Sequence, residues 1–418
     1  MRVAELASRG VNLIRTAVLA LVSTAAIFLT ACSGGGSGSP VGQVGTVAHL
    51  GPGLPGVGTL PSPASEWPEA GYDARFSSGT TATGPQSAKV KWMRSLGGNV
   101  TPGPVIGVDG SILAATNAGV LHALDPATGA GRWTYDGQGS YGSDLSTSAA
   151  VLADGTILWP GPNNTLSALT KTGGLLWKQQ LDGQVLSPAV AGVNRVYVAD
   201  MSGHLSAFEI TPSAHRLVWT LDIGGIDYSS ASVGPDGTIY TGADHDLVAI
   251  RDLGESGAVR WRFDAKRIVE VSNGVAPDGT VVLGTNHGRE YGVRPDGTVA
   301  WSFDIKDNTY SSSVVRPDGT AYFGDNSGRL RIVSPGGAVT HDIAPLGRKK
   351  ESIWTSPAVD AKGNVYWGST NGNVYGYDHN AKRLFALALD GSINSYPAIG
   401  RDGTLYLGTT TGTLYAIG

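Results

Sequence analysis

Aromatic, acidic and amide side chains recur at one point of a repeated pattern in this chain, and together they could bind a ligand. They are Tyr228, Glu270, Tyr310, Trp354 and Asn394, and each immediately precedes a short segment of small and apolar residues. Aromatic faces with a few polar groups can hold a sugar, a peptide or a side chain of a protein partner. The same aromatic residues could instead close a channel mouth and pack on neighbouring loops. The corresponding residues of the other repeats are Thr101, Ser146 and Val185.

A basic run stands just before one of these residues. Arg348, Lys349 and Lys350 precede Trp354 in the segment LGRKKESIW, and we expect them on the same face of the molecule. Such a run is typical of a solvated loop, but it could also attract an anion or an acidic partner surface. Together, the aromatic set and the basic run mark the face on which we expect a ligand or partner to bind.

Residues that could perform catalysis or hold a metal ion do not converge in the sequence. His245 lies between Asp244 and Asp246, but zinc needs four ligands and calcium six to eight oxygen atoms, so we interpret this cluster as a surface turn. No nucleophile elbow, phosphate-binding loop or dinucleotide fingerprint follows an expected strand. Glu270 is the one carboxylate expected near the axis, and a lone carboxylate needs a partner for acid–base chemistry. We therefore predict no catalytic residue and no metal site.

The elements that position these residues come from an internal repeat. Tryptophans recur at spacings of 40 to 44 residues, and Thr340 and Phe385 continue the frame without a tryptophan. The six tryptophans are Trp92, Trp133, Trp177, Trp219, Trp261 and Trp301. Eight units of about 41 residues result, and repeats of this length are typical of solenoids and propellers.

Each unit predicts four short strands separated by turns. In the unit that begins at Tyr228, the expected strands are 230–233, 238–241, 247–250 and 259–263. A tight Asp-Gly turn follows the first strand in most units, and in residues 277–301 such a turn also precedes the fourth strand. This pattern predicts an all-β fold, an eight-bladed β-propeller of four-stranded antiparallel blades. A seven-bladed ring with residues 340–384 outside it is the alternative, but that unit keeps the same motifs.

The ends of the array predict how the ring closes. Residues 89–94 form a fourth strand with no preceding three, and the C-terminus ends in a third strand with no fourth. Pairing these two segments would complete the last blade and remove an exposed sheet edge. We therefore expect one propeller domain over residues 66–418.

The N-terminus has the composition of an export signal. Three arginines flank an apolar run of residues 16–30, which is short for a membrane-spanning helix and right for a signal peptide. The run ends in Leu29-Thr30-Ala31-Cys32, which resembles a bacterial lipoprotein signal in which Cys32 is lipidated after cleavage. A plain secretory signal is the alternative. We assign residues 1–31 to the signal peptide and residues 32–65, rich in Gly, Ser and Pro, to a tether.

Several segments resemble the pyrroloquinoline-quinone-type propeller repeat, also called quinoprotein-like. They are SPAV at residues 187–190 and 356–359, LHALDPATGAGRW at 121–133 and GTLYLGTTTGTLYAIG at the C-terminus. The resemblance covers roughly residues 67–418, and the Gly-His and Trp-Asp signature of WD40 repeats is missing. It implies that the six tryptophans dock each blade on the next.

Proteins with this repeat differ in function. One class contains eight-bladed dehydrogenases that hold the quinone over the axis beside a calcium ion. Another contains non-catalytic lipoproteins such as the propeller subunit of the outer-membrane β-barrel assembly machinery. Many of the dehydrogenases carry an adjacent cysteine pair, whereas this chain has a single cysteine, Cys32. Their tryptophan-docking pattern is approached only by Ala123, Asp125, Gly129 and Trp133, so the residues favour the non-catalytic class.

Composition excludes a strongly basic, nucleic-acid-binding protein, because only 15% of residues are charged and the formal net charge is −4. We predict a monomeric, non-catalytic lipoprotein of the bacterial cell envelope that binds a protein partner through the loops between blades. It would be anchored to the outer membrane if one is present, and otherwise to the outer face of the cytoplasmic membrane. The alternatives are an extracellular carbohydrate-binding or ligand-binding module and a quinone-dependent oxidoreductase holding pyrroloquinoline quinone (PQQ) with calcium. No other cofactor is expected.

Overall fold

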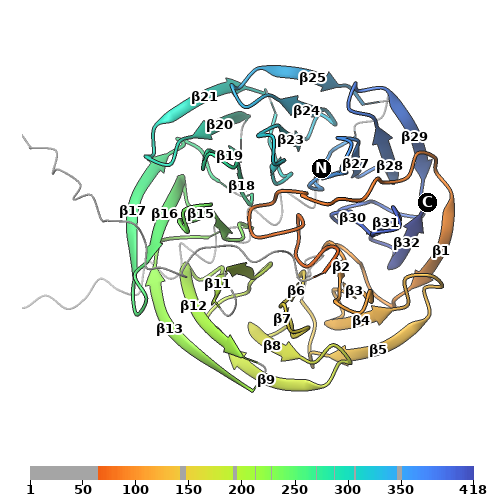
Figure 1. Cartoon of the computed structure of the whole chain (residues 1–418), viewed down its shortest axis with the longest axis horizontal. Coiled ribbons are helices and arrows are strands. Elements are labelled where there is room, and N and C mark those ends of the chain that lie inside the picture. Colours follow the sequence, from red (N-terminus) through yellow and green to blue (C-terminus); the bar gives the residue numbers. More distant parts are fainter. Residues whose placement is uncertain are drawn as a thin grey trace, which may run out of the picture. The chain divides into compact units, whose positions relative to one another are not determined.

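The strands form eight blades around one axis. The structure is a computed structural model that describes residues 65–141, 147–191, 195–211, 213–226, 228–269, 271–286, 288–305, 307–345 and 351–418. Every sheet has four antiparallel strands, and Figure 1 shows the sheets arranged as blades in a ring. This confirms the predicted all-β, eight-bladed propeller. The described ranges form no helix, so none of them contains a helix that could cross a membrane.

The blades follow one another in chain order. The strands of blades 1 and 2 are β2 (Val105–Ile106), β3 (Ile112–Ala115), β4 (Val120–Leu124), β5 (Gly131–Asp136), β6 (Ala150–Val151), β7 (Ile157–Gly161), β8 (Thr165–Leu169) and β9 (Leu175–Gln180). Those of blades 3 and 4 are β10 (Ala189–Ala191), β11 (Arg195–Ala199), β12 (His204–Thr211), β13 (Ala214–Asp222), β14 (Ser232–Val233), β15 (Ile239–Ala243), β16 (Asp246–Asp252) and β17 (Gly257–Asp264).

The second half of the ring repeats this arrangement. The strands of blades 5 and 6 are β18 (Gly274–Val275), β19 (Val281–Gly284), β20 (Arg289–Val293), β21 (Val299–Asp304), β22 (Val314–Val315), β23 (Ala321–Gly324), β24 (Leu330–Val333) and β25 (Val339–Ile343). Those of blades 7 and 8 are β26 (Ala358–Val359), β27 (Val365–Gly368), β28 (Asn373–Tyr377), β29 (Arg383–Ala388), β30 (Ala398–Ile399), β31 (Leu405–Gly408), β32 (Thr413–Ile417) and β1 (Val90–Ser95).

Tight turns join the first and second strands of blades 1, 2 and 4 to 8 on one face of the ring, here called the turn face. In blade 5, Gly279 has a φ of +83°, and Oδ1 of Asp278 accepts a 2.9 Å hydrogen bond from the amide of Thr280. Glycine suits this turn because other residues are strained at positive φ. The second Asp-Gly turn of the blade, with Gly297 at φ +86°, joins its third and fourth strands. The connections between blades reach the opposite ends of the first strands, on what we call the loop face.

The hydrophobic core consists of layers between neighbouring blades. The inner strand β15 is buried along its whole length, whereas the outermost strand β17 is partly exposed throughout. One layer joins Tyr240 of blade 4 to Val281 and Leu283 of blade 5, and all three side chains are buried. Inner strands are mainly apolar because a neighbouring blade covers each of their faces and removes both from water.

The first and last strands of the ring meet in blade 8. β1 pairs antiparallel with β32, and Trp92 lies opposite Ala416. The order of this sheet is β1-β32-β31-β30, so the N-terminal strand supplies the outermost strand of the last blade. As a result, β32 has a partner on both sides and does not present an unpaired edge.

A segment preceding the first strand crosses the middle of the ring on the turn face, and we call residues 65–84 the strap (orange in Figure 1). Trp67 and Phe76 of the strap are only 1% and 3% exposed. Strap carbonyl oxygens accept hydrogen bonds of 2.7 to 2.9 Å from amides at the ends of first strands: Pro68 from Val151, Ala74 from Val233, Arg75 from Val275 and Phe76 from Val315. The strap therefore covers the turn-face end of the axis.

Candidate functional site

Two of the predicted aromatic residues meet on the loop face, between blades 6 and 7. The ring centroids of Tyr310 and Trp354 are 6.1 Å apart, and the rings are inclined at 81° in an edge-to-face arrangement. The indole Nε1 of Trp354 donates a 2.6 Å hydrogen bond to Oδ1 of Asn326, and Nδ2 of Asn308 donates to the Tyr310 hydroxyl at 3.2 Å. We call these four residues the aromatic site. Trp354 is 37% exposed, so this ring is both accessible and held in position.

Backbone contacts fix the loops that carry the aromatic site. The amide of Asn326, in the turn between β23 and β24, donates to the carbonyl of Asn308 at 2.9 Å. The amide of Ile353 donates to the carbonyl of Asp325 at 3.0 Å, and its side chain is buried against Gly324. A Cβ atom at Gly324 would lie 2.3 Å from Cγ2 of Ile353, so only glycine permits this close approach. The site is therefore set by the strands beneath it before any partner binds.

A buried carboxyl group lies directly under the aromatic site. Glu290 of β20 is fully buried, and its Oε1 accepts a 3.1 Å hydrogen bond from the hydroxyl of Thr309, which stands between Asn308 and Tyr310. Its Oε2 has no hydrogen-bond partner among the described residues. Burial raises the pKa of Glu290 to about 8, against the opposing effect of Thr309 and of the Arg331 charge. The group is therefore protonated near neutral pH.

An ion pair anchors the turn that presents Asn326. Asp325 is fully buried, and its Oδ2 contacts the guanidinium of Arg331, which is 8% exposed. Oδ1 of Asp325 accepts hydrogen bonds from the amides of Ser327 at 2.9 Å and Arg329 at 3.1 Å. A buried ion pair stabilises a conformation when its remaining lone pairs are also satisfied, as they are here.

The other predicted site residues do not join this cluster in the described part of the chain. Tyr228 is 44% exposed and has a φ of +32°, whereas Val185, at the same point of blade 3, is 2% exposed. Asn394 is half-buried, and its Oδ1 has no partner among the described residues. The residues that lie outside the described ranges are Cys32, Ser146, Glu270, Arg348, Lys349 and Lys350.

Two members of the aromatic site, Asn308 and Asn326, were not predicted from the sequence. Asn326 lies in the turn between the second and third strands, and an asparagine occurs at the same point in other blades, for example Asn117 and Asn286. Oδ1 of Asn117 accepts a 2.9 Å hydrogen bond from the amide of Asn99, in the connection that enters blade 1. Recurrence of asparagine in these turns was the signal that could have drawn attention to them.

The repeated tryptophans lie between neighbouring blades. The indole N–H of Trp92 donates to the carbonyl of Pro126 at 2.8 Å, that of Trp133 to Lys171 at 3.0 Å and that of Trp261 to Pro295 at 2.9 Å. Each acceptor is in the turn between the third and fourth strands of the next blade. Trp177 instead stacks on His215, with ring centroids 4.0 Å apart.

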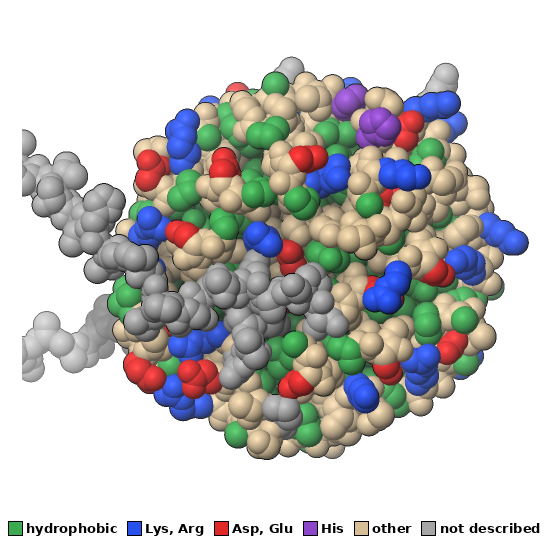
Figure 2. Space-filling model, viewed as in Figure 1, with side chains coloured by type: hydrophobic (Ala, Val, Ile, Leu, Met, Phe, Trp, Pro, Cys, Tyr) green, Lys and Arg blue, Asp and Glu red, His purple; other side chains and the backbone are tan. Residues whose placement is uncertain are grey.

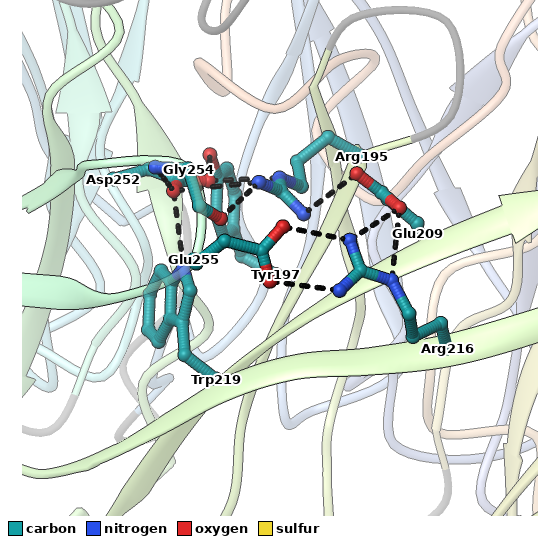
Figure 3. Close-up of polar contacts among 8 residues, drawn as sticks. All are labelled: Arg195, Tyr197, Glu209, Arg216, Trp219, Asp252, Gly254 and Glu255. Atoms are coloured by element: carbon teal, nitrogen blue, oxygen red, sulfur yellow. Dashed lines mark hydrogen bonds and ion pairs between the residues drawn. The ribbon is translucent and has the colours of Figure 1, made fainter.

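A charged cluster joins blades 3 and 4 (Figure 3). Asp252 is 4% exposed and accepts hydrogen bonds from the Tyr197 hydroxyl at 2.8 Å and from the Trp219 indole at 3.0 Å, while Nε of Arg195 lies 2.8 Å from its Oδ2. Nearer the surface, Arg216 bridges Glu209 and Glu255, and this guanidinium holds the pKa of Glu255 below its usual range. All of these charges are satisfied by one another. We interpret the cluster as a structural contact that holds blades 3 and 4 together, and not as a catalytic site.

Surface charge is mixed on the face drawn in Figure 2, where the described acidic and basic side chains are interspersed. The acidic residues on either side of His245 are also in contact with neighbouring groups. Oδ2 of Asp246 lies 3.4 Å from Arg262, and Oδ2 of Asp244 accepts a hydrogen bond from the amide of Gly225 at 3.2 Å. Their carboxylates are engaged in these local contacts, as expected for a surface turn.

A family of known proteins matches most of this ring. Residues 117–222 and 212–418 match the PQQ_2 family model, which is described as outer membrane protein assembly factor BamB. The chain belongs to this family. The match confirms the resemblance to the quinoprotein-like propeller repeat that the sequence motifs indicated.

Curated relatives of the chain have the same description. It is 28% identical over 153 residues to the outer membrane protein assembly factor BamB of Yersinia pestis, covering 33% of this chain and 38% of that protein. It is 26% identical over 206 residues to the BamB of Moranella endobia (strain PCIT), covering 43% of this chain and 52% of that protein. The matched stretches thus span about half the length of these relatives, or less.

Solved structures share the fold at low sequence identity. The crystal structure of BamB from Moraxella catarrhalis superimposes with a TM-score of 0.63 and 15% identity, covering 79% of this chain and 99% of that chain. The quinohemoprotein alcohol dehydrogenase from Comamonas testosteroni gives a TM-score of 0.70 and 13% identity, covering 85% of this chain and 81% of that chain. At these identities, both comparisons support the propeller fold alone.

The donor set of the described residues does not fit a calcium ion beside a quinone. Calcium takes six to eight oxygen ligands, with carboxylates prominent among them. The aromatic site offers two amides, a phenol and an indole, and the indole N–H cannot coordinate a metal. Among the described residues, no three His, Cys, Asp or Glu side chains are grouped so that they could hold a metal ion. We therefore derive no chemistry through a quinone.

Proposed function

We propose that this protein is a non-catalytic lipoprotein of the cell envelope that binds a protein partner through the loop face and acts in outer membrane protein assembly. The observation that carries the proposal is the pre-positioned aromatic pair on that face, in which Tyr310 is half-buried and Trp354 is exposed. Membership of a family described as an assembly factor supports the same class of function. In this proposal, Cys32 carries the lipid anchor, and Tyr228, Glu270, Asn394 and the basic run 348–350 extend the binding face.

Physical chemistry favours an aromatic pair as the centre of a protein interface. Tryptophan and tyrosine are enriched among the residues that dominate binding energy, because they bury much area while losing few rotamers. Trp354 loses even less freedom on binding, since its indole is already hydrogen-bonded to Asn326. Pre-organisation of this kind lowers the entropic cost of association.

The same geometry favours a protein over a carbohydrate as the bound partner. A carbohydrate site uses polar side chains that are available to the sugar hydroxyls. Here the amides of Asn308 and Asn326 hold Tyr310 and Trp354 in position. The accessible part of the site is therefore mainly the aromatic surface, which suits apolar and aromatic side chains of a protein.

The proposal is tested by replacing the exposed aromatic residue. Full-length protein, its Trp354→Ala variant and its Leu217→Ala variant would be purified from cell envelopes with their bound proteins. Leu217 is 49% exposed on β13 and lies away from the loop face, so it is the matched control. We expect Trp354→Ala alone to lose an outer membrane protein assembly component, with a dissociation constant raised by roughly 30-fold, the effect of a 2 kcal/mol hot spot. Equal recovery with both variants would contradict the proposal.

A further inference from the structure

The interface between blades 5 and 6 departs from the pattern of the other blades at the middle of the second strand. In blades 3, 4, 6, 7 and 8 this position is a tyrosine: Tyr197, Tyr240, Tyr322, Tyr366 and Tyr406. Each ring is buried, and in blade 4 the centroid of Tyr240 lies 5.8 Å from that of Trp261. In blade 5 the position is Val282. Its side chain is smaller than a tyrosine and does not fill the space that a phenol ring occupies in the other five blades.

A second departure occurs next to the first. The third-strand residue paired with the docking tryptophan is alanine in blades 1, 2, 3, 4 and 8, but it is Gly292 in blade 5. A Cβ atom at Gly292 would lie 2.4 Å from Cε2 and 2.5 Å from Nε1 of Trp301. Glycine therefore lets the Trp301 indole lie against the backbone of its own blade.

The Trp301 indole lacks the contact with the next blade that Trp92, Trp133 and Trp261 make, as does the indole of Trp177. Nε1 of Trp261 donates to the carbonyl of Pro295 in the next blade, whereas Nε1 of Trp301 is buried with no partner among the described residues. The equivalent acceptor would be in the turn at Pro335. The small side chain at 282 and the displaced indole together open the interface between the two blades.

A pocket of about 170 Å³ occupies this opening on the turn face. Its walls are Ala276, Val282 and Trp301 from blade 5 and Pro317 and Pro335 from blade 6, and Asp278 and Asp318 also line it. The volume is below the 300 Å³ or more of typical drug-sized ligand sites. It is close to that of an engineered apolar cavity, about 150 Å³, that binds benzene. A guest of one aromatic ring fits.

We infer that this pocket binds the side chain of a tyrosine presented by a partner protein. The walls of the pocket are those that surround a tyrosine in the other blades. In blade 8, the Tyr406 ring packs near Gly400, which corresponds to Ala276, and its hydroxyl donates to the carbonyl of Pro126, which corresponds to Pro335. A guest phenol would find the same apolar slot in blade 5.

Carboxylates in the pocket favour tyrosine over phenylalanine. Inside the ring, the hydroxyls of Tyr197 and Tyr366 donate to Asp252 at 2.8 Å and to Asp360 at 3.2 Å. Asp278 can accept a hydrogen bond from a guest phenol in the same way. Asp318 is less available, because its Oδ2 lies 3.4 Å from Arg316.

This pocket is independent of the aromatic site. It opens on the turn face, whereas Tyr310 and Trp354 lie on the loop face at the other end of the first strands. A tyrosine-bearing segment could occupy the pocket while another surface binds the loop face. The inference and the proposed function can therefore be tested separately, and failure of one does not affect the other.

Fluorine NMR of full-length, fluorotryptophan-labelled protein tests the inference, with the Trp301 resonance assigned from a Trp301→Phe variant. The probes are N-acetyl-tyrosinamide, N-acetyl-leucinamide and N-acetyl-argininamide. We expect the tyrosine probe to shift the Trp301 resonance saturably, with a dissociation constant at least about tenfold lower than that of either comparator. No saturable shift, or equal binding of the arginine probe, would overturn the inference.

Filling the pocket gives the decisive control. Val282→Tyr restores the residue of five other blades, and we expect it to fold normally and to weaken binding of the tyrosine probe by about tenfold or more. Val282→Leu, which copies Leu113 and Leu158 of blades 1 and 2, should weaken binding partially and guards against misfolding of the tyrosine variant. Val339→Tyr, at a position 43% exposed on β25, should leave binding unchanged. Undiminished binding by Val282→Tyr would refute the assignment.

Discussion

Glu290 places a carboxyl group at a buried position that is apolar in every other blade. The equivalent position is leucine or valine in every other blade: Leu121, Leu166, Leu205, Leu247, Leu330, Val374 and Leu414. In blades 4, 6, 7 and 8 an apolar side chain of the following connection packs at this point, as Ile353 does near Gly324, but Thr309 takes that place over Glu290. A buried carboxyl therefore replaces an apolar contact beneath the aromatic site.

The raised pKa of Glu290 predicts how stability depends on pH. The folded-state pKa is about 8 and the ordinary value is 4.5, so the folded protein retains a proton that the unfolded chain releases between these values. Stability must then fall as pH rises from about 4.5 to about 8, by about 5 kcal/mol at most. We expect Glu290→Leu to melt at a higher temperature than the natural protein at pH 9, and the difference to shrink at pH 5.

Glu290→Gln is the matched control for that measurement. It keeps a neutral group of the same shape that can accept the hydrogen bond from Thr309, so it should lose the pH dependence without gaining an apolar contact. Melting curves of the three proteins at both pH values check the account. If the melting temperatures of all three proteins changed equally between the two pH values, Glu290 would not control the pH dependence of stability.

The chemistry of single residues was the least accessible part of the structure from the sequence. The spacing before each first strand identified Tyr310 and Trp354, because that position recurs in every unit. Asn326 and Glu290 were not recognised, since their roles depend on which neighbour faces them across the blade interface. The recurrence of asparagine in the turns marks Asn326 as a candidate, but register and packing decide which residue it contacts, and a single sequence does not give them.

At the scale of elements, the closing strand β1 has the clearest energetic role. Trp92 is 8% exposed, donates to Pro126 of blade 1 and packs against Tyr406 of blade 8 with ring centroids 5.9 Å apart. It thus joins the N-terminal strand, the last blade and the first blade. Met93, the next residue on the same strand, is 65% exposed.

Truncation of these two neighbours should have very different effects. We expect Trp92→Ala to lower the free energy of unfolding by about 3 to 5 kcal/mol, the usual cost of deleting a buried large aromatic side chain. Met93→Ala should change it by about 0.5 kcal/mol or less, as for most surface substitutions. Chemical denaturation of the full-length variants measures both values. If the two substitutions lowered the free energy of unfolding by similar amounts, the contacts of Trp92 would contribute little to the closure of the ring.

Elements were predicted from the sequence more completely than residues were. Most blades contain an Asp-Gly turn, apolar inner strands and a docking aromatic residue, and all keep the same spacing, so the blade count followed from local patterns. The strap was not predicted, because its contacts are made by backbone carbonyls such as those of Ala74 and Arg75, which any residue could supply. The pocket at Val282 was not predicted either, because its walls come from two blades that meet only in the folded ring.

At the scale of the whole molecule, the two faces of the ring differ. The strap covers the axis on the turn face, and its buried Trp67 and Phe76 tie it to the blades. The loop face presents Tyr310 and Trp354 on connections fixed by blade 6. The proposed binding of a protein partner through the loop face follows from this asymmetry, with anchoring through Cys32 as the companion proposal.

Photo-crosslinking in living cells tests the central claim most directly. A photo-reactive amino acid would replace Tyr310 in one strain and Leu217, on the outer rim, in another. Our account predicts a covalent product with one outer membrane protein assembly component from position 310 and none from position 217. A product from position 217 with none from position 310 would contradict it and would place the partner on the rim.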